Sequence, residues 1–261
     1  MGKKELQAKQ QNAVALPTEA AEWGLDEAVD TQDILIPKLL VMQGLSKAVA
    51  DEKAQMGEFI DSLTYEILGS AREKDPKPVE FIPLTMFKTW IRYEKIGDDK
   101  LDFRGIHPVT PENADWKWEE TDEDGNHFRN DQCLNFYVIL KEKADDPMEM
   151  PYLLTFRRTS YKNGKKLATH FAKCQRALQL NKVVPPASNT FKLTAVKTTN
   201  DEGTFYVMDI EPGGKTSKEH IQVAKDWVAT IKQSNVKVDN SDIVGDESEK
   251  TEAVDVDNSE F

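Results

Sequence analysis

From Pro151 to Asn200 the chain has no aspartate and no glutamate, although the whole sequence of 261 residues contains 46 of them. This absence excludes an ordinary solvated face, in which both signs of charge are mixed. The rest of the chain is neutral to acidic, the net charge is -12, and the residues from Asp239 onward carry nine acids and one lysine. An acidic protein that gathers its positive charge in one block is predicted to bind a polyanion there. The block holds ten cations, Arg157, Arg158, Lys162, Lys165, Lys166, Lys173, Arg176, Lys182, Lys192 and Lys197.

Two further absences concern the location of the protein. No stretch approaches the roughly 18 consecutive apolar residues of a membrane span, and the first residues, Met1 to Glu5, lack the apolar core of a signal peptide. The sequence has only two cysteines, Cys133 and Cys174, which lack CxxC spacing and lie within apolar patterns. Such cysteines are typical of reduced thiols in the core of a cytosolic protein. We therefore expect a cytoplasmic protein.

Aromatic residues are interleaved with the cations of the block. Single-stranded nucleic acid is held by cations along its backbone and by rings stacked on its unpaired bases, so this composition indicates a single-strand site. Tyr152 and Phe156 share one face of an expected strand, so a place in the core is the alternative for both rings. The predicted DNA-binding residues are Tyr152, Phe156, Arg157, Arg158, Tyr161, Lys162, Lys165, Lys166, Lys173, Arg176, Lys192 and Lys197.

The hydrophobic pattern predicts a mainly β fold with helices, of the α+β class. We expect an extended segment over Asp33–Ala50, a hairpin or two short strands over Gly57–Leu68, and strands over Val79–Tyr93, Gln132–Lys141 and Pro151–Arg158. A turn at Lys162-Asn163-Gly164 should precede a helix with the apolar stripe Leu167, Phe171, Cys174 and Leu178. Two more strands, Thr190–Thr198 and Thr204–Ile210, and a final helix from its N-cap Ser217 to Ser234 complete the pattern.

The order of three strands or strand groups, one helix and two strands is that of the OB-fold, a five-stranded, partly open barrel. Residues 31–235 are the predicted OB-like domain. Within it, residues 97–126 are an acidic, loop-like insertion, in which Trp116 and Trp118 could form a small hairpin arm. Residues 1–30 are predicted to be a flexible arm, and residues 236–261 a disordered acidic tail.

The tail ends in Val256-Asp257-Asn258-Ser259-Glu260-Phe261, a single aromatic residue after acids. A basic, aromatic, OB-like body followed by such a tail resembles the single-stranded DNA-binding proteins of bacteria and tailed phages, in particular the phage-encoded ones. The resemblance implies binding of single-stranded DNA during replication and recombination, in the cytoplasm of a bacterial host. It also implies recruitment of replication or recombination proteins by the tail residues Asp255, Asp257, Glu260 and Phe261.

This chain departs from the bacterial members, which have a shorter body and a proline before the last phenylalanine, where it has Glu260. The number of subunits is therefore not carried over, and a homo-oligomer remains open. A single-strand annealing recombinase, which also binds single strands but assembles into rings, is one alternative.

A metal-dependent nuclease is the other alternative, because Asp98-Asp99-Lys100 and Asp115-Trp116-Lys117 have the carboxylate–lysine pattern of such enzymes. Both triplets fall in the acidic insertion rather than on a rigid strand. No histidine lies at ligand-like spacing from a cysteine. Gly213-Gly214-Lys215-Thr216 resembles part of a phosphate-binding loop, but Asp209 stands where the first glycine is needed. We therefore expect a binding protein that is not an enzyme, with no metal and no cofactor.

Overall fold

The computed structural model describes residues 35–71, 76–97, 100–201 and 203–234. The predicted N-terminal arm, residues 1–30, and the predicted acidic tail, residues 236–261, lie outside the described residues. The strands are β1 (Leu39–Val41), β2 (Glu58–Asp61), β3 (Ile67–Ser70), β4 (Val79–Ile96), β5 (Lys100–Pro108), β6 (Glu119–Thr121), β7 (His127–Leu140), β8 (Tyr152–Phe156), β9 (Asn189–Asn200) and β10 (Gly203–Lys215). The helices are α1 (Lys47–Ala50), α2 (Tyr161–Gln179) and α3 (Lys218–Ser234), with short 3-10 helices η2 (Lys141–Lys143), η3 (Arg158–Ser160) and η4 (Pro186–Ser188).

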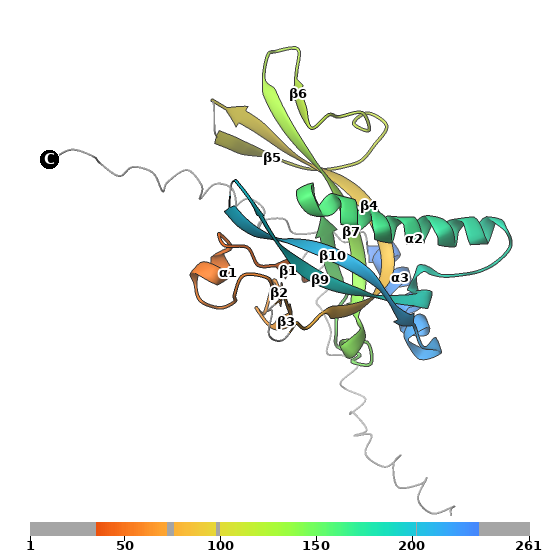
Figure 1. Ribbon diagram of the computed structural model, residues 1–261. Helices are drawn as coiled ribbons and strands as arrows, with labels where there is room; N and C mark the ends of the chain where they lie inside the picture. Colours follow the sequence, from red (N-terminus) through yellow and green to blue (C-terminus); the bar gives the residue numbers. More distant parts are fainter. Residues whose placement is uncertain (1–34, 72–75, 98–99, 202, 235–261) are drawn as a thin grey trace, which may run out of the picture. The chain divides into compact units, whose positions relative to one another are not determined.

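Two long strands, β4 and β7, organise the main antiparallel sheet (Figure 1). Near its start β4 pairs with β9, and near its end it pairs with β5. In the same way β7 pairs first with β6 and then with β8. One half of the β4–β7 ladder therefore belongs to a body of order β10-β9-β4-β7-β8, and the other half to an arm made with β5 and β6.

The mainly β fold with helices is confirmed, and so is the order of three body strands, one helix and two strands. The body strands form a curled, antiparallel half-barrel. Its two edge strands, β8 and β10, do not pair with each other among the described strands. No helix of the described residues is long and apolar enough to cross a membrane.

The loop-like character expected for residues 97–126 is wrong. Residues 100–108 form β5, which pairs with the end of β4, and residues 119–121 form β6, which pairs with the start of β7. Leu101 and Phe103 pack against the buried Ile91 and Tyr93, so β5 has an apolar face of its own. The high acid content of the segment hid this alternation. Because Glu119 and Glu120 of β6 pair with cations of β4, on the other side of β7, a strongly charged sequence still forms strands here.

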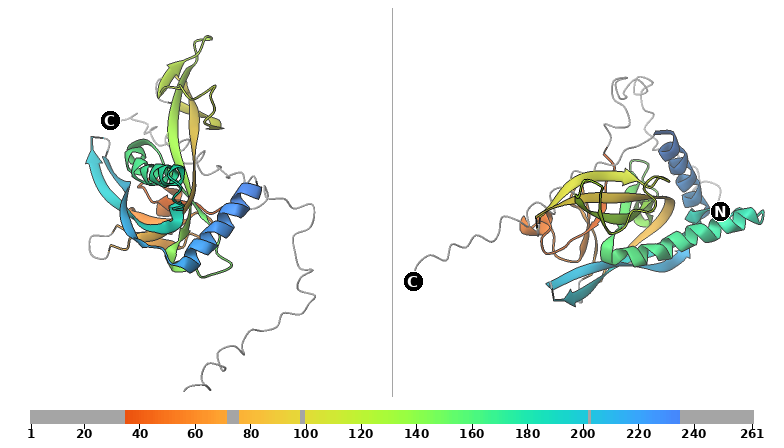
Figure 2. Two further views of the ribbon diagram at one scale, coloured as in Figure 1. Left: turned by 90° about the vertical axis from the view of Figure 1, so that its right-hand side faces the viewer. Right: turned by 90° about the horizontal axis from the view of Figure 1, so that it is seen from above.

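Alternation along β7 places side chains into two cores. The expected inward residues of β7, Leu134, Phe136, Val138 and Leu140, all lie in the larger core, which α2 covers with Leu167. Their neighbours Tyr137 and Ile139 point to the other face, where they pack in a second core with Ala224 of α3. The two long helices thus lie on opposite sides of the β4–β7 pair (Figure 2). The final helix and its N-cap are confirmed, because the Ser217 hydroxyl accepts the His220 backbone N–H at 3.1 Å.

The first strands form a separate antiparallel sheet, β1-β2-β3, so the expected hairpin is confirmed. The segment expected to be extended is so up to β1, where it lies along the body and the Pro37 carbonyl accepts the Leu153 backbone N–H at 2.8 Å. Its last residues, Lys47–Ala50, form the helix α1 instead. Phe59 of β2 and Leu68 of β3 are buried in the larger core, so the small sheet packs against the body.

The turn expected at Lys162-Asn163-Gly164 lies instead inside α2, which begins at Tyr161. Tertiary contacts outweigh the turn-forming preference of Asn and Gly here. The Asn163 side-chain amide donates to the Met208 carbonyl at 2.9 Å, and the Ser160 hydroxyl accepts the Met208 N–H at 3.3 Å. Gly164 packs so closely on β8 that an added Cβ would lie 2.6 Å from the Cβ of Phe156. The first turn of α2 therefore fills the gap between the edge strands β8 and β10.

Candidate nucleic-acid interface

Two of the three rings predicted to stack on bases belong to the core. Tyr152 and Phe156 are 1% and 0% exposed and pack in the larger core, so neither face is open to a base. The structure therefore shows the alternative, a place in the core, for both rings. The prediction of Tyr152 and Phe156 as DNA-contacting rings is therefore corrected, because the edge strand β8 is covered by α2 and by the small sheet.

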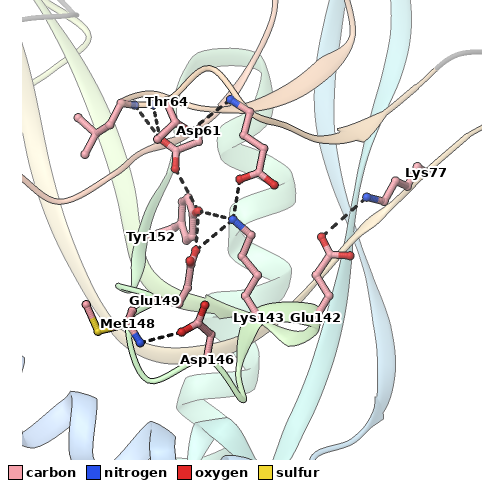
Figure 3. Close-up of polar contacts among 11 residues, drawn as sticks. Asp61, Thr64, Lys77, Glu142, Lys143, Asp146, Met148, Glu149 and Tyr152 are labelled. Carbon is pink, nitrogen blue, oxygen red and sulfur yellow. Dashed lines mark hydrogen bonds and ion pairs between the residues drawn. The ribbon is translucent and has the colours of Figure 1, made fainter. Parts of the chain in front are cut away.

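The Tyr152 hydroxyl has a structural role (Figure 3). It lies 2.7 Å from Glu149 Oε1 and 3.1 Å from Asp61 Oδ2, and Lys143 joins Glu149 to Glu66. Burial, followed by the hydrogen bond to Glu149, raises the pKa of Tyr152 far above its usual value. This network fastens β2 and β8 to the loop before β8, and it keeps a buried hydroxyl satisfied.

Most of the predicted cations meet on one exposed face of α2. Residues 162, 166, 173 and 176 recur at helical spacing, opposite the buried Leu167 and Cys174. We call this face the basic stripe; it consists of Lys162, Lys165, Lys166, Lys173 and Arg176, all exposed. From Lys162 to Arg176 it extends roughly 21 Å along the helix at about 1.5 Å per residue. In the described part of the chain, only Lys166 of these five has an acidic partner, Asp209.

Tyr161 lies beside the basic stripe and is half-buried. The Nζ atom of Lys165 lies 5.1 Å from the centre of its ring, and its hydroxyl donates to Gln132. Burial raises the pKa of Tyr161. Of the three predicted stacking rings, this is the one whose surface remains partly accessible.

Arg157 and Arg158 lie at the junction of β8 and α2, and the structure separates their roles. Arg158 binds the fully buried carboxylate of Asp131, which also accepts the Arg129 Nε–H at 3.2 Å. Arg158 has a positive φ of 49°, a strained value for a residue other than glycine. Arg157 is half-buried, and its Nη1 donates to the Tyr93 hydroxyl at 3.4 Å. Arg157 has no carboxylate partner among the described residues, so its charge can add to that of the basic stripe.

Lys192 and Lys197 are not part of this face. Phe191 and Leu193 of β9 point into the core that α2 covers, so Lys192 between them points to the opposite face. Its Nζ lies there 3.6 Å from Glu80 Oε1. Lys197 is exposed near the far end of the β9–β10 hairpin, opposite Tyr206. The sequence block thus contributes to at least three surfaces.

A pocket of about 470 Å³ lies beside the basic stripe, between α2 and the β9–β10 hairpin. Its walls are Lys166, His170 and Lys173 of α2, Asn189, Thr190 and Phe191 of β9, and Ile210, Pro212 and Gly213 of β10. Sequence reasoning missed the strand residues of this pocket. The pair Gly213-Gly214 was the sequence feature that could have indicated this pocket, but its pattern predicted only a turn before a helix. The structure shows Gly213 and Gly214 in a bulge of β10, between the pairs Pro212–Phe191 and Lys215–Asn189.

The residues named for other functions are not brought together. Asp115 is exposed in the arm, Asp98 lies outside the described residues, and so do the tail residues Asp255, Asp257, Glu260 and Phe261. In the described ranges, no three histidine, cysteine or acidic side chains are grouped so as to hold a metal ion.

The described residues thus define a mainly β protein with a curled sheet and one cationic helical face. The family model described as Pam3 phage gp34-like protein matches residues 7–237, and the chain belongs to this family of phage proteins. No curated protein and no solved structure matches the chain significantly.

Proposed function

We propose that this phage protein binds single-stranded DNA, with little sequence preference, during phage replication and recombination. One observation supports the proposal above all others: the basic stripe is a row of exposed cations that, apart from Lys166, have no acidic partner in the described part of the chain. Unpaired cations in a row suit a phosphate backbone, because each can displace a condensed counterion. Tyr161 beside the stripe offers a ring for an unpaired base.

The fold is consistent with this function. The body strands and α2 follow the chain order of an OB-fold, a class that binds oligonucleotides. In our proposal the body is a variant of the five-stranded barrel, in which the first turn of α2 occupies the place where the edge strands would meet.

The test compares labelled oligothymidylate with duplex DNA of equal length by fluorescence anisotropy. A label on the DNA is needed, because the described tryptophans lie on the arm and on α3 rather than on the basic stripe. We expect binding of the single strand that weakens steeply with salt. Binding of neither DNA, or stronger binding of the duplex, would contradict the proposal.

A fourfold variant identifies the surface. Replacing Lys162, Lys165, Lys173 and Arg176 by alanine should reduce the salt slope of log K by roughly 0.7 for each phosphate that the variant no longer neutralises. The matched control replaces four exposed lysines elsewhere, Lys47, Lys88, Lys100 and Lys117. Equal reductions in the two variants would show nonspecific attraction instead of a site.

The remaining expectations belong to the same proposal. The protein acts without catalysis, metal or cofactor in the host cytoplasm, and the tail residues Asp255, Asp257, Glu260 and Phe261 recruit replication or recombination proteins. Replacing Phe261 by alanine should abolish recruitment and leave DNA binding unchanged; normal recruitment would contradict this role. Electron microscopy with single-stranded DNA separates coating from annealing, because an annealing recombinase assembles into rings.

A further inference from the structure

The pocket beside the basic stripe has a cationic rim. Lys166, His170 and Lys173 follow one another at i, i+4 and i+7 on α2, so all three face the pocket. Lys173 has no acidic partner among the described residues, while Lys166 is paired with Asp209. Lys215 approaches from β10 and donates to the Asn189 side-chain oxygen at 2.9 Å. Lys166 and Lys173 on the rim, with Lys215 beside it, stand against one carboxylate, so this side of the pocket is positive.

The inner wall of the pocket is apolar and rigid. Phe191 and Ile210 are 7% and 3% exposed, and Pro212 lies beside them on β10. His170 is fixed over Phe191 with ring centres 5.0 Å apart. Its Nε2 lies 2.8 Å from the Pro186 carbonyl. Since a carbonyl can only accept, Nε2 carries the proton and the ring cannot turn freely. Little of the Phe191 ring is open, because Phe81 stacks on it and His170 lies over it, so a flat ligand meets mainly the exposed Pro212 beside it.

The bulge of β10 gives the pocket its polar end. Gly214 N–H donates to the Thr190 hydroxyl at 2.8 Å. Gly213 lies so close to Thr190 that an added Cβ would be 2.3 Å from that oxygen, so only glycine permits this approach. The Asn189 amide donates one N–H to the Ser188 hydroxyl at 3.3 Å. An amide has two N–H donors, so its second can reach a ligand.

The cationic rim matches the phosphate of a nucleotide, and the apolar wall with its amide donor matches the base. The volume of about 470 Å³ is within the usual range for small-ligand pockets, roughly 300–1,000 Å³. The basic stripe continues past the pocket on both sides, from Lys162 to Arg176, so a bound strand could enter and leave along α2.

We propose that this pocket holds one nucleotide of the bound single strand. Lys166 and Lys173 hold its phosphates, the Phe191–Pro212 wall packs on its base, and the free amide hydrogen of Asn189 donates to an acceptor on the base. This inference rests on the single-strand binding proposed above and specifies one subsite within it.

Photocrosslinking locates this subsite directly. The probe is an oligothymidylate that carries one 4-thiothymidine, used with the full chain. We expect crosslinks in the peptides that contain residues 189–191 or 210–213. Asn189→Trp should fill the pocket and remove these crosslinks. Lys173→Ala should weaken binding by about fivefold, the value of one exposed charge-assisted contact. Lys182→Ala is the matched control, because Lys182 is an exposed lysine of the same block outside the pocket.

The outcomes separate the subsite from the function. If the oligonucleotide binds but crosslinks only elsewhere, and Lys173→Ala behaves like Lys182→Ala, the subsite is wrong while the proposed function stands. If free thymidine monophosphate shifts the NMR signals of His170 and the oligonucleotide does not, the pocket serves free nucleotides and our assignment to the strand is wrong. If the oligonucleotide does not bind at all, both proposals fail. If Asn189→Trp does not fold, Lys173→Ala and the crosslink map still decide the question.

Discussion

The arm and the basic stripe both carry many cations, but those named below in the arm are paired with carboxylates, whereas most of those in the stripe have no such partner among the described residues. In the arm, Arg92 lies between the rings of Trp116 and Phe128, 4.2 and 3.8 Å from their centres, and it pairs with Glu120 at 2.8 Å. Lys95 and Arg104 also have carboxylate partners on other strands of the arm. On α2 the corresponding charges face solvent, and only Lys166 is paired in the described residues.

The difference teaches that the number of cations does not define a binding surface. Paired cations of the arm hold strands together and add little net charge to attract a polyanion. Unpaired cations in a row contribute little to stability and leave their charge available to a ligand. The arm should therefore respond to substitutions through stability, and the basic stripe through binding.

The largest effect on the arm is expected from Asp131→Asn. This fully buried carboxylate joins Arg129 to Arg158, and its neutralisation removes one shared counter-charge from two partly buried guanidinium groups. Breaking such a pair costs about 3–5 kcal/mol of the free energy of unfolding. Chemical denaturation measures it, with Asp115→Asn as an exposed control. If the free energy of unfolding decreases by less than about 1 kcal/mol, the range of a surface ion pair, the ion pairs of the arm do not stabilise it as this comparison requires.

Gly164→Ala tests the close packing of α2 on β8. The added methyl group would meet Phe156, so we expect a destabilisation of about 1–3 kcal/mol, although alanine otherwise favours a helix. Gly214→Ala is the control, because no atom lies within 4 Å of its added Cβ. If Gly164→Ala is stabilising, α2 does not pack on β8 as described, and the basic stripe is placed differently.

The buried thiol of Cys133, at the base of the arm, should make the free energy of unfolding depend on pH. Burial is the main cause that raises the pKa of its thiol from 9.0 to about 12. Below pH 9 the thiol is neutral in both states and has no effect. Above it the unfolded state ionises first, so stability should fall by up to about 1.4 kcal/mol per pH unit. Unfolding at about pH 8 and about pH 10 should show a larger decrease for the wild type than for Cys133→Ala. Equal decreases would mean that this thiol is accessible.

The smallest expected effects distinguish an unpaired lysine of the basic stripe from a paired lysine of the arm. Lys162→Ala, on the basic stripe, should weaken oligothymidylate binding by about fivefold and leave stability unchanged. Lys95→Ala, whose partner is Glu119, should leave affinity unchanged and cost at most about 1 kcal/mol of stability. Anisotropy and denaturation of both variants measure these effects. The reverse pattern would place the DNA on the arm.

Much of the fold could be predicted because the apolar pattern is locally encoded. The alternation of Leu134, Phe136 and Val138, and the helical spacing of Leu167 and Cys174, gave the correct elements and their buried faces. The expected stripe was too long by one residue, because Leu178 is 58% exposed. The same periodicity placed Lys166, Lys173 and Arg176 of the basic stripe on the other side of the helix, whereas Lys162 was expected in the turn before it. The strands of the arm could not be predicted in this way, because acids such as Glu94, Glu119 and Glu120 are neutralised by cations of other strands.

The sequence by itself determined a chain with its positive charge in one block, a mainly β body and a helix with opposite apolar and basic faces. Only the tertiary structure decided that Tyr152 and Phe156 are core, because one strand pattern fits either a buried or an open face. It also decided that Lys192 points away from α2 and that Asn163 and Gly164 are helical. These outcomes depend on partners far away in the sequence, such as Glu80 and Met208, and no local pattern contains them.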